Sequence, residues 1–341
     1  MPARGRQQGS GGHIWAAHRL AFLVVLAVAL AAGALFGVAW VAGFHGVLVA
    51  LVHPRWEWLV VAVGAEALAY AGYTLAYWRF VGAERGAEIE VSKAAAIVTT
   101  GFSVFVHGGG FALDREALRR AGLSTDEARR RVLGLGVLEY AVLAPATAVA
   151  AGLVLFHKQS VSASLTVPWI VGVPVGAALA LTALYFVARV RRWTLIGKPF
   201  GHFLDALGFV LRLFRSPLRN GPAFLGMLVY WIGDIGCLWA ALHAFYAHTP
   251  PLAQLIVGYA TGYAVTRRTL PLGGAGVVEA LLPFALGWVE IALAPAVLAV
   301  FAYRLLNLWV PMVPALVGIP TIRRLEGKRV RAAGRRRAKH A

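Results

Sequence analysis

Long apolar runs constrain this chain more than any other feature of its 341 residues. An α-helix needs about 20 consecutive apolar residues to cross the hydrocarbon core of a bilayer. Runs of roughly that length or longer cover 20–43, 58–80, 133–156, 167–188, 223–246 and 293–319. In lipid the backbone must satisfy its own hydrogen bonds, and a helix does so within one segment. The sequence therefore predicts an all-α polytopic membrane protein with about six full transmembrane helices.

Charged residues are scarce, at 14% of the chain, which is about half their usual share in soluble domains. They are also unevenly placed. Residues 1–19 hold three Arg and no acidic residue, and residues 322–341 hold nine Lys or Arg against one Glu. Basic segments beside membrane spans favour the cytoplasm. We therefore expect two basic cytoplasmic tails, 1–19 and 322–341, around a transmembrane domain at 20–321.

The connecting segments support the same topology. Basic residues cluster between the second and third runs and between the fourth and fifth, whereas 44–57, 157–166 and 247–252 hold only Arg55 and Lys158. This asymmetry is typical of a multi-pass membrane protein whose basic loops and termini face the cytoplasm. Segment 200–215 has helical apolar spacing with basic interruptions, which predicts an amphipathic helix on the inner surface.

The basic tails have two interpretations. Nucleic-acid binding is one. The other, which we favour, is a topology anchor that contacts anionic lipids. No nucleic-acid partner is therefore expected. The lone cysteine, Cys237, excludes an internal disulfide framework.

Two apolar segments are too short to cross. Segments 94–106 and 252–265 have lengths that fit re-entrant or broken helices. They also resemble each other: TGFSV, GGG and EAL follow in order from residue 100, and TGYAV, GGAG and EAL from residue 261. The pattern predicts an inverted repeat with halves at about 20–156 and 167–319 and oppositely oriented re-entrant hairpins at about 93–120 and 252–288. Chance similarity between Gly- and Ala-rich helices is the alternative.

The second hairpin predicts an anion site. A helix that begins near Gly276 would aim free N–H groups and its positive dipole end into a cavity. Arg267 and Arg268 would add two guanidinium groups, which bind phosphate oxygens in bidentate fashion. A lipid phosphate is the expected ligand. Alternatively, the two arginines cap the preceding helix and pair with Glu279.

Other polar residues fall inside the apolar runs, where ionisable groups are costly and usually functional. Arg304 needs a carboxylate partner, for which Glu139 and Asp234 are the candidates, and the pair is either structural or part of a substrate site. His107, before the first glycine cluster, is a candidate headgroup contact or a structural turn residue. Glu66 and His243 also lie within runs. No nucleotide-binding, zinc-protease or nucleophile-elbow motif is present, so we predict no catalytic residue, metal or cofactor.

The C-terminal part resembles the lysylphosphatidylglycerol synthase transmembrane region family of bacterial and archaeal membrane proteins. The family's P-x-G-G-x-G-x-x-E pattern matches Pro271, Gly273, Gly274, Gly276 and Glu279, and its later Tyr-Arg pair matches Tyr303 and Arg304. The segment GGGFALDREALRRAGLS at 108–124 is similar to an earlier family segment but lacks its proline. The resemblance covers about 20–320.

That resemblance implies flippase-like translocation of an anionic, aminoacylated or polyprenyl-phosphate-linked lipid between the leaflets of the bacterial cytoplasmic (inner) membrane. Only a short basic tail follows the last apolar run, so we expect no aminoacyl-transferase domain here. If the lipid needs such synthesis, a separate enzyme would perform it. The partners expected are a phospholipid or glycolipid substrate, and a homodimer is one candidate assembly. An intramembrane transferase acting on a lipid phosphate and a non-transporting lipid-binding protein are the alternative functions.

Overall fold

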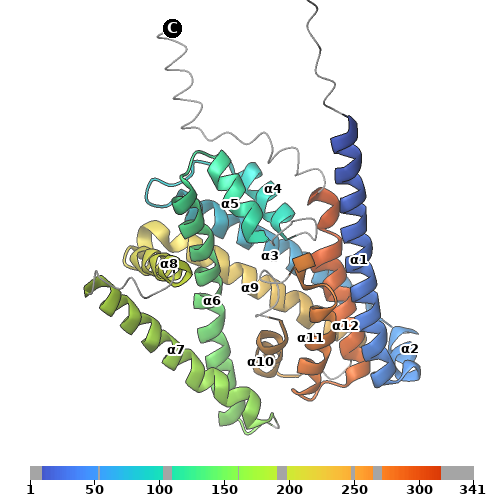
Figure 1. Ribbon diagram of the computed structural model, residues 1–341. Helices are drawn as coiled ribbons and strands as arrows, with labels where there is room; N and C mark the ends of the chain where they lie inside the picture. Colours follow the sequence, from blue (N-terminus) through green and yellow to red (C-terminus); the bar gives the residue numbers. More distant parts are fainter. Residues whose placement is uncertain are drawn as a thin grey trace, which may run out of the picture.

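The structure is a computed structural model, and it describes residues 10–52, 54–102, 110–159, 161–189, 198–246, 250–263 and 271–315. Within these ranges every regular element is helical (Figure 1). Six helices are long and apolar enough to cross a membrane. They are α1 (Ser10–Ala42), α3 (Trp56–Gly82), α6 (Thr125–Phe156), α7 (Ala163–Arg189), α9 (Pro217–Phe245) and the segment that begins with α12 (Leu293–Arg304) and runs to Ala315. The all-helical class and the six spans predicted from sequence are confirmed.

Shorter elements connect the long helices. They are α2 (Phe44–Val52), α4 (Val91–Gly101), α5 (Gly110–Arg120), α8 (Lys198–Phe214), α10 (Leu252–Tyr263), the 3-10 turn η1 (Pro271–Gly274), α11 (Val277–Gly287) and the π-helix η2 (Leu305–Trp309). At about 1.5 Å per residue, an 11-residue helix is about 17 Å long, which is too short for a hydrocarbon core of about 30 Å. The re-entrant paths expected for α4–α5 and α10–α11 remain predictions.

The segment between the first two spans differs from expectation. Residues 44–52, predicted as part of a loop, form helix α2. Gly43, at φ +82°, ends α1 in a conformation that favours glycine and turns the chain into α2. Val47 of α2 then packs with Val38 of α1 and Val297 of α12. This apolar contact stabilises a helix that is too short to be recognised by its length.

The centre of the fold is the close packing of α3 against α9, the second span of each predicted half. A Cβ added at Gly72 would lie 2.5 Å from the backbone nitrogen of Tyr230, and one at Gly226 would lie 2.6 Å from that of Ala76. The two backbones therefore touch where both helices carry small residues. In lipid, helix association depends on this kind of close approach, because apolar side chains are equally well solvated by the hydrocarbon.

Helix α6 begins earlier than the apolar run suggests. Ser124 caps it by accepting a hydrogen bond from the backbone N–H of Glu127, so the helix starts at Thr125 rather than near Leu133. Arg131, expected in a cytoplasmic loop, is instead only 1% exposed and pairs with Glu127 at 2.7 Å. Its guanidinium also donates to the backbone oxygen of Phe80 at 3.2 Å and so caps the end of α3.

Helices α7 and α8 lie at one side of the bundle (Figure 1). Helix α8 covers the segment predicted to be amphipathic, and its apolar side packs through Phe209 against Phe80 of α3. Most of α7 is exposed, including Leu179 and Phe186. The position of α8 at the inner membrane surface is still a prediction.

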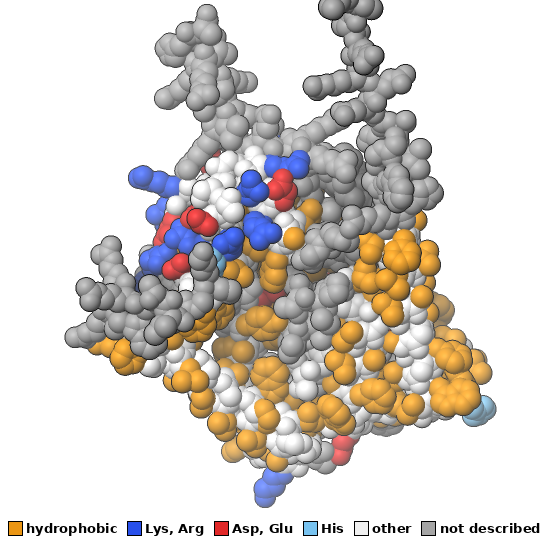
Figure 2. Space-filling view, viewed as in Figure 1, with side chains coloured by type: hydrophobic (Ala, Val, Ile, Leu, Met, Phe, Trp, Pro, Cys, Tyr) orange, Lys and Arg blue, Asp and Glu red, His pale blue; other side chains and the backbone are white. Residues whose placement is uncertain are grey.

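The surface pattern agrees with a membrane environment. Apolar side chains cover the middle of the face in Figure 2, while Lys and Arg side chains gather at one end, over α5 and the start of α6. Exposed large apolar residues occur on α1, α3, α6, α7 and α9. Such broad apolar exposure would be unstable in water and is normal for helices in lipid. The chain is a multi-pass membrane protein.

Candidate functional site

A buried carboxylate, Asp234, lies at the centre of the bundle. It sits halfway along α9 and is 0% exposed. The hydroxyl of Tyr259 donates to its Oδ2, and the hydroxyl of Tyr303 donates to the same oxygen at 2.8 Å. Asn307 donates to Oδ1 at 2.6 Å. The carboxylate therefore joins α9 to α10, α12 and the π-helix through hydrogen bonds to both its oxygens.

Asn307 extends this network to α3. Its Nδ2 also donates to Glu66 Oε1 at 3.1 Å, and its Oδ1 accepts from the hydroxyl of Tyr263 at 3.2 Å. The hydroxyl of Tyr70 donates to the backbone oxygen of Asn307 at 3.0 Å. Asn307 lies in η2, where a π-helical turn interrupts the span, and such turns are frequent at functional sites. One amide thus links two carboxylates on different spans.

An ion pair holds the α11 hairpin tip next to this network. Arg304 Nε donates to Glu279 Oε1 at 2.7 Å, and its terminal nitrogen donates to the backbone oxygen of Gly273 at 3.0 Å. Both charged side chains are buried. Glu279 also accepts from the backbone N–H of Gly276 at 2.7 Å. Glu279 therefore caps its own helix and also neutralises the charge of Arg304. Arg304 in turn holds the glycine turn through the backbone oxygen of Gly273.

This pairing changes two expectations. The partner of Arg304 is Glu279, whereas Glu139 and Asp234 were the predicted candidates. The amide of Gly276, expected to face an anion, is occupied by the Glu279 carboxylate. The reason is local: the chain turns through positive φ values at Leu272, Gly273 and Gly274 in η1 and at Gly276 just after it, which brings Glu279 back over the helix start. An external phosphate at Gly276 would have to displace this carboxylate.

Glu139 belongs to a second polar contact on α6. Its Oε1 accepts from the hydroxyl of Tyr73, and its backbone oxygen accepts from the indole N–H of Trp231 at 3.0 Å. These contacts join α6 to both helices of the central pair. The ring of Trp231 also packs on Tyr259, with centroids 6.1 Å apart. Trp231 therefore lies between the Glu139 contact and the network around Asp234.

Several other predicted residues can be placed. Pro271, Gly273 and Gly274 form η1, and Gly276 precedes α11. His243 packs on Trp58 and Trp239 and hydrogen-bonds the backbone oxygen of Trp239, as part of an aromatic cluster. Arg267, Arg268 and His107 lie outside the described residues, so the phosphate site built on the two arginines stays a prediction. Among the described residues, no cluster of three His, Cys, Asp or Glu side chains could hold a metal ion.

The sequence interpretation missed Tyr259 and Asn307 as partners of the carboxylates, and it missed Tyr263 as a partner of Asn307. A signal existed for the tyrosines, because residues four apart on a helix share one face, and both hydroxyls face the same network. Asn307 had a weaker signal, an amide inside an apolar run. Its place opposite Asp234 depends on the π-helical turn, which apolar spacing does not predict.

Comparison with models of known protein families shows which family the chain belongs to. The model of the family described as lysylphosphatidylglycerol synthase TM region matches residues 23–315. The chain belongs to this family. The match includes both short helical pairs and every polar contact described above, so the resemblance found in the sequence is confirmed. Comparison with curated proteins gave no match. Membership in the TM region family makes the chain a lipid-related membrane protein.

Proposed function

We propose that this member of the TM region family translocates a phospholipid between the leaflets of the bacterial cytoplasmic membrane. The network of Asp234, Asn307 and Glu66 carries the proposal, because it places hydrogen-bonding side chains within the spans. A polar headgroup can cross hydrocarbon only where such groups replace its water. Ionisable side chains inside spans mark transport pathways in many membrane proteins.

The substrate proposed is an anionic or aminoacylated phospholipid. The family description, a lysylphosphatidylglycerol synthase TM region, supports a headgroup of this kind. The phosphate would contact Arg267 and Arg268, and the remaining headgroup hydroxyls or amine would exchange hydrogen bonds with the tyrosines around Asp234. In this account Arg304 and Glu279 fix the tip of the α10–α11 hairpin and do not bind the lipid themselves.

The hairpins would supply the pathway. We propose that α4–α5 and α10–α11 enter from opposite sides and meet near Asp234, as half-helices do in transporters with inverted repeats. The order of elements supports this arrangement: a long helix, a short helix, a second long helix, a short pair and a third long helix occur in each half of the chain. Both termini would then be cytoplasmic.

A substitution of the central carboxylate tests the proposal. Asp234→Asn retains the shape of the side chain but replaces one carboxylate oxygen with an amide NH2, which donates and therefore opposes either the tyrosine hydroxyls or Asn307. We expect purified Asp234→Asn protein in proteoliposomes to lose most leaflet exchange of a headgroup-labelled phospholipid. Asp205→Asn, at an exposed position of α8, is the matched control and should exchange lipid at the wild-type rate. Equal exchange by both variants would contradict a role for the network.

The same vesicles address enzymatic function. Lipids extracted after incubation should be chemically unchanged if the protein only translocates them. A new lipid species that appears with the wild-type protein and not with Asp234→Asn would instead support an intramembrane transferase.

A further inference from the structure

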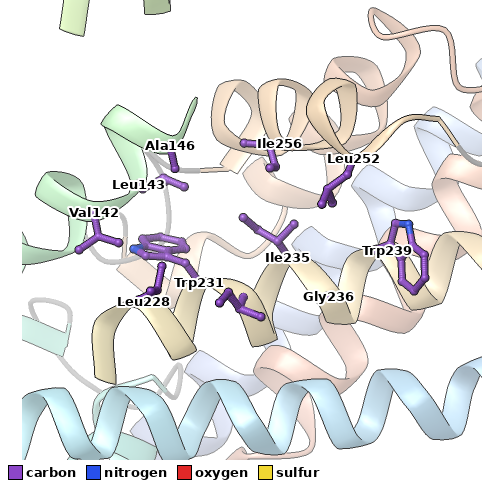
Figure 3. Close-up of a pocket in the computed structure, with 11 residues that line it drawn as sticks. Val142, Leu143, Ala146, Leu228, Trp231, Ile235, Gly236, Trp239, Leu252 and Ile256 are labelled. Carbon is purple, nitrogen blue, oxygen red and sulfur yellow. The ribbon is translucent and has the colours of Figure 1, made fainter. Parts of the chain in front are cut away.

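A groove runs along the side of the bundle between α6, α9 and α10 (Figure 3). Its volume is about 410 Å³, which falls within the range of about 300–1,000 Å³ typical of ligand pockets. Side chains from all three helices point into it in Figure 3. Its lining residues are aliphatic, tryptophan and glycine, without a charged side chain. The groove therefore fits an apolar ligand.

The floor and the rim of the groove differ in exposure. Leu143, Trp231 and Ile235 form the floor and are 1%, 6% and 9% exposed. Leu228 and Ile232 of α9, on the rim, are 45% and 57% exposed. Because α6 and α9 are membrane spans, the rim opens into hydrocarbon rather than water. The medium that reaches the groove is thus the acyl region of the bilayer.

The length of the groove matches one leaflet. Along α9 it extends from Leu228 to Trp239, which is about 17 Å at about 1.5 Å per residue. The hydrocarbon core is about 30 Å thick, so this is roughly the depth that one acyl chain occupies. The groove begins at Leu228, about one turn before Trp231 in the middle of α9, and extends to Trp239 toward the C-terminal end of the helix.

Only one layer of side chains separates the groove from the polar network. Trp231 lines the groove, packs on Tyr259 and donates to the backbone of Glu139 at 3.0 Å. On its other side Tyr259 donates to Asp234. The residues Trp231 and Ile235 face the groove, while Asp234 between them faces the network. Helix α9 thus presents an apolar site and a polar site at the same depth.

We propose that this groove binds an acyl chain of the phospholipid whose headgroup engages the network. The proposal rests on the proposed function for the identity of the lipid. Binding the chain beside Trp231 keeps the lipid at the bundle while its headgroup leaves the interface.

Photo-crosslinking tests acyl-chain binding without requiring transport. The probe is phosphatidylglycerol with a diazirine in one acyl chain, added to proteoliposomes of unlabelled phosphatidylglycerol and phosphatidylethanolamine that contain the full chain. After irradiation, mass spectrometry maps the labelled peptides. We expect labelling of 142–146 and 228–239 to exceed that of the exposed face of α7, represented by Leu179 and Leu181, which are 66% and 53% exposed.

Two α6 variants sharpen the measurement. Ala146→Phe fills the groove, and Val149→Phe adds the same ring one turn away at a residue that is 64% exposed and does not line the groove. We expect Ala146→Phe to lower labelling of 228–239 by about tenfold, the effect of about 1.4 kcal/mol, and Val149→Phe to leave it unchanged. Equal thermal unfolding of both variants would establish that the fold is intact.

Other outcomes would overturn the inference. Labelling that follows exposure alone and is unaffected by Ala146→Phe would mean that bulk lipid merely contacts this face. Crosslinks between two protein chains at 228–232 would mean that a second copy covers the groove. Groove-specific labelling without leaflet exchange would retain the acyl-chain site and contradict translocation instead.

Discussion

Arg304 and Glu279 form an ion pair at 2.7 Å with side chains that are 1% and 0% exposed. The pair joins α12 to the start of α11, and the same guanidinium donates to the backbone oxygen of Gly273 in η1, the turn that precedes α11. A buried charge that loses its partner is far more costly than a buried pair. The hairpin tip is therefore tied to the last span by residues that depend on each other.

A double-mutant cycle tests this dependence. Arg304→Met leaves the Glu279 carboxylate without its cation, and such losses typically cost about 3–5 kcal/mol. We expect Arg304→Met to unfold at a clearly lower temperature in detergent. Arg304→Met combined with Glu279→Leu should recover part of that loss, because no buried charge is left. A wild-type unfolding temperature for Arg304→Met alone would contradict the pairing.

The sequence could predict the spans but not this pair. Six spans follow from local composition, since about 20 apolar residues in a row are enough to indicate a crossing. The partner of Arg304 is 25 residues away and depends on how η1 folds. Arg131 was predicted to lie in a loop because apolar content marks only the part of a helix that lies in hydrocarbon. Helix α6 extends beyond that part to the Ser124 cap and includes Arg131. Charge pairing between elements has no periodic signal in one sequence.

Glycine substitutions on α3 and α9 test the central helix pair. A Cβ at Gly226 of α9 would lie 2.6 Å from the backbone nitrogen of Ala76, so Gly226→Ala must push α3 and α9 apart. A Cβ at Gly64, in the interior of α3, would meet no atom within 4 Å. We expect Gly226→Ala to lower the unfolding temperature. Gly64→Ala should raise the unfolding temperature slightly, because glycine within a helix costs roughly 0.5–1 kcal/mol of stability relative to alanine.

That comparison also has a clear negative outcome. If Gly226→Ala and Gly64→Ala change the unfolding temperature equally, the backbones of α3 and α9 do not touch at Gly226.

The two adjacent arginines of the second hairpin provide a test of phosphate recognition. Guanidinium groups bind phosphate in bidentate fashion, so Arg267→Ala with Arg268→Ala should abolish leaflet exchange and leave the amount of purified protein unchanged. Arg191→Ala with Arg192→Ala removes another adjacent pair, in the basic segment before α8. That control should exchange lipid at the wild-type rate. Exchange that persists in the first variant would exclude the proposed phosphate site.

Thiol labelling tests the topology. Cys237 is the chain's single cysteine and is fully buried, so introduced cysteines can be labelled against a low background. In intact cells a membrane-impermeant maleimide should react with Ser162→Cys, between α6 and α7. It should react with Ala338→Cys only after the membrane is permeabilised. Reversed accessibility would contradict cytoplasmic termini.

The most direct measurement of translocation is leaflet exchange by the purified wild-type chain. A fluorescent aminoacylated phosphatidylglycerol is placed in both leaflets of proteoliposomes, and a membrane-impermeant reductant then quenches the outer leaflet. If the protein translocates the lipid, nearly all fluorescence is lost over time in vesicles that contain it, while about half persists in protein-free vesicles. If half persists in both, the central claim is wrong.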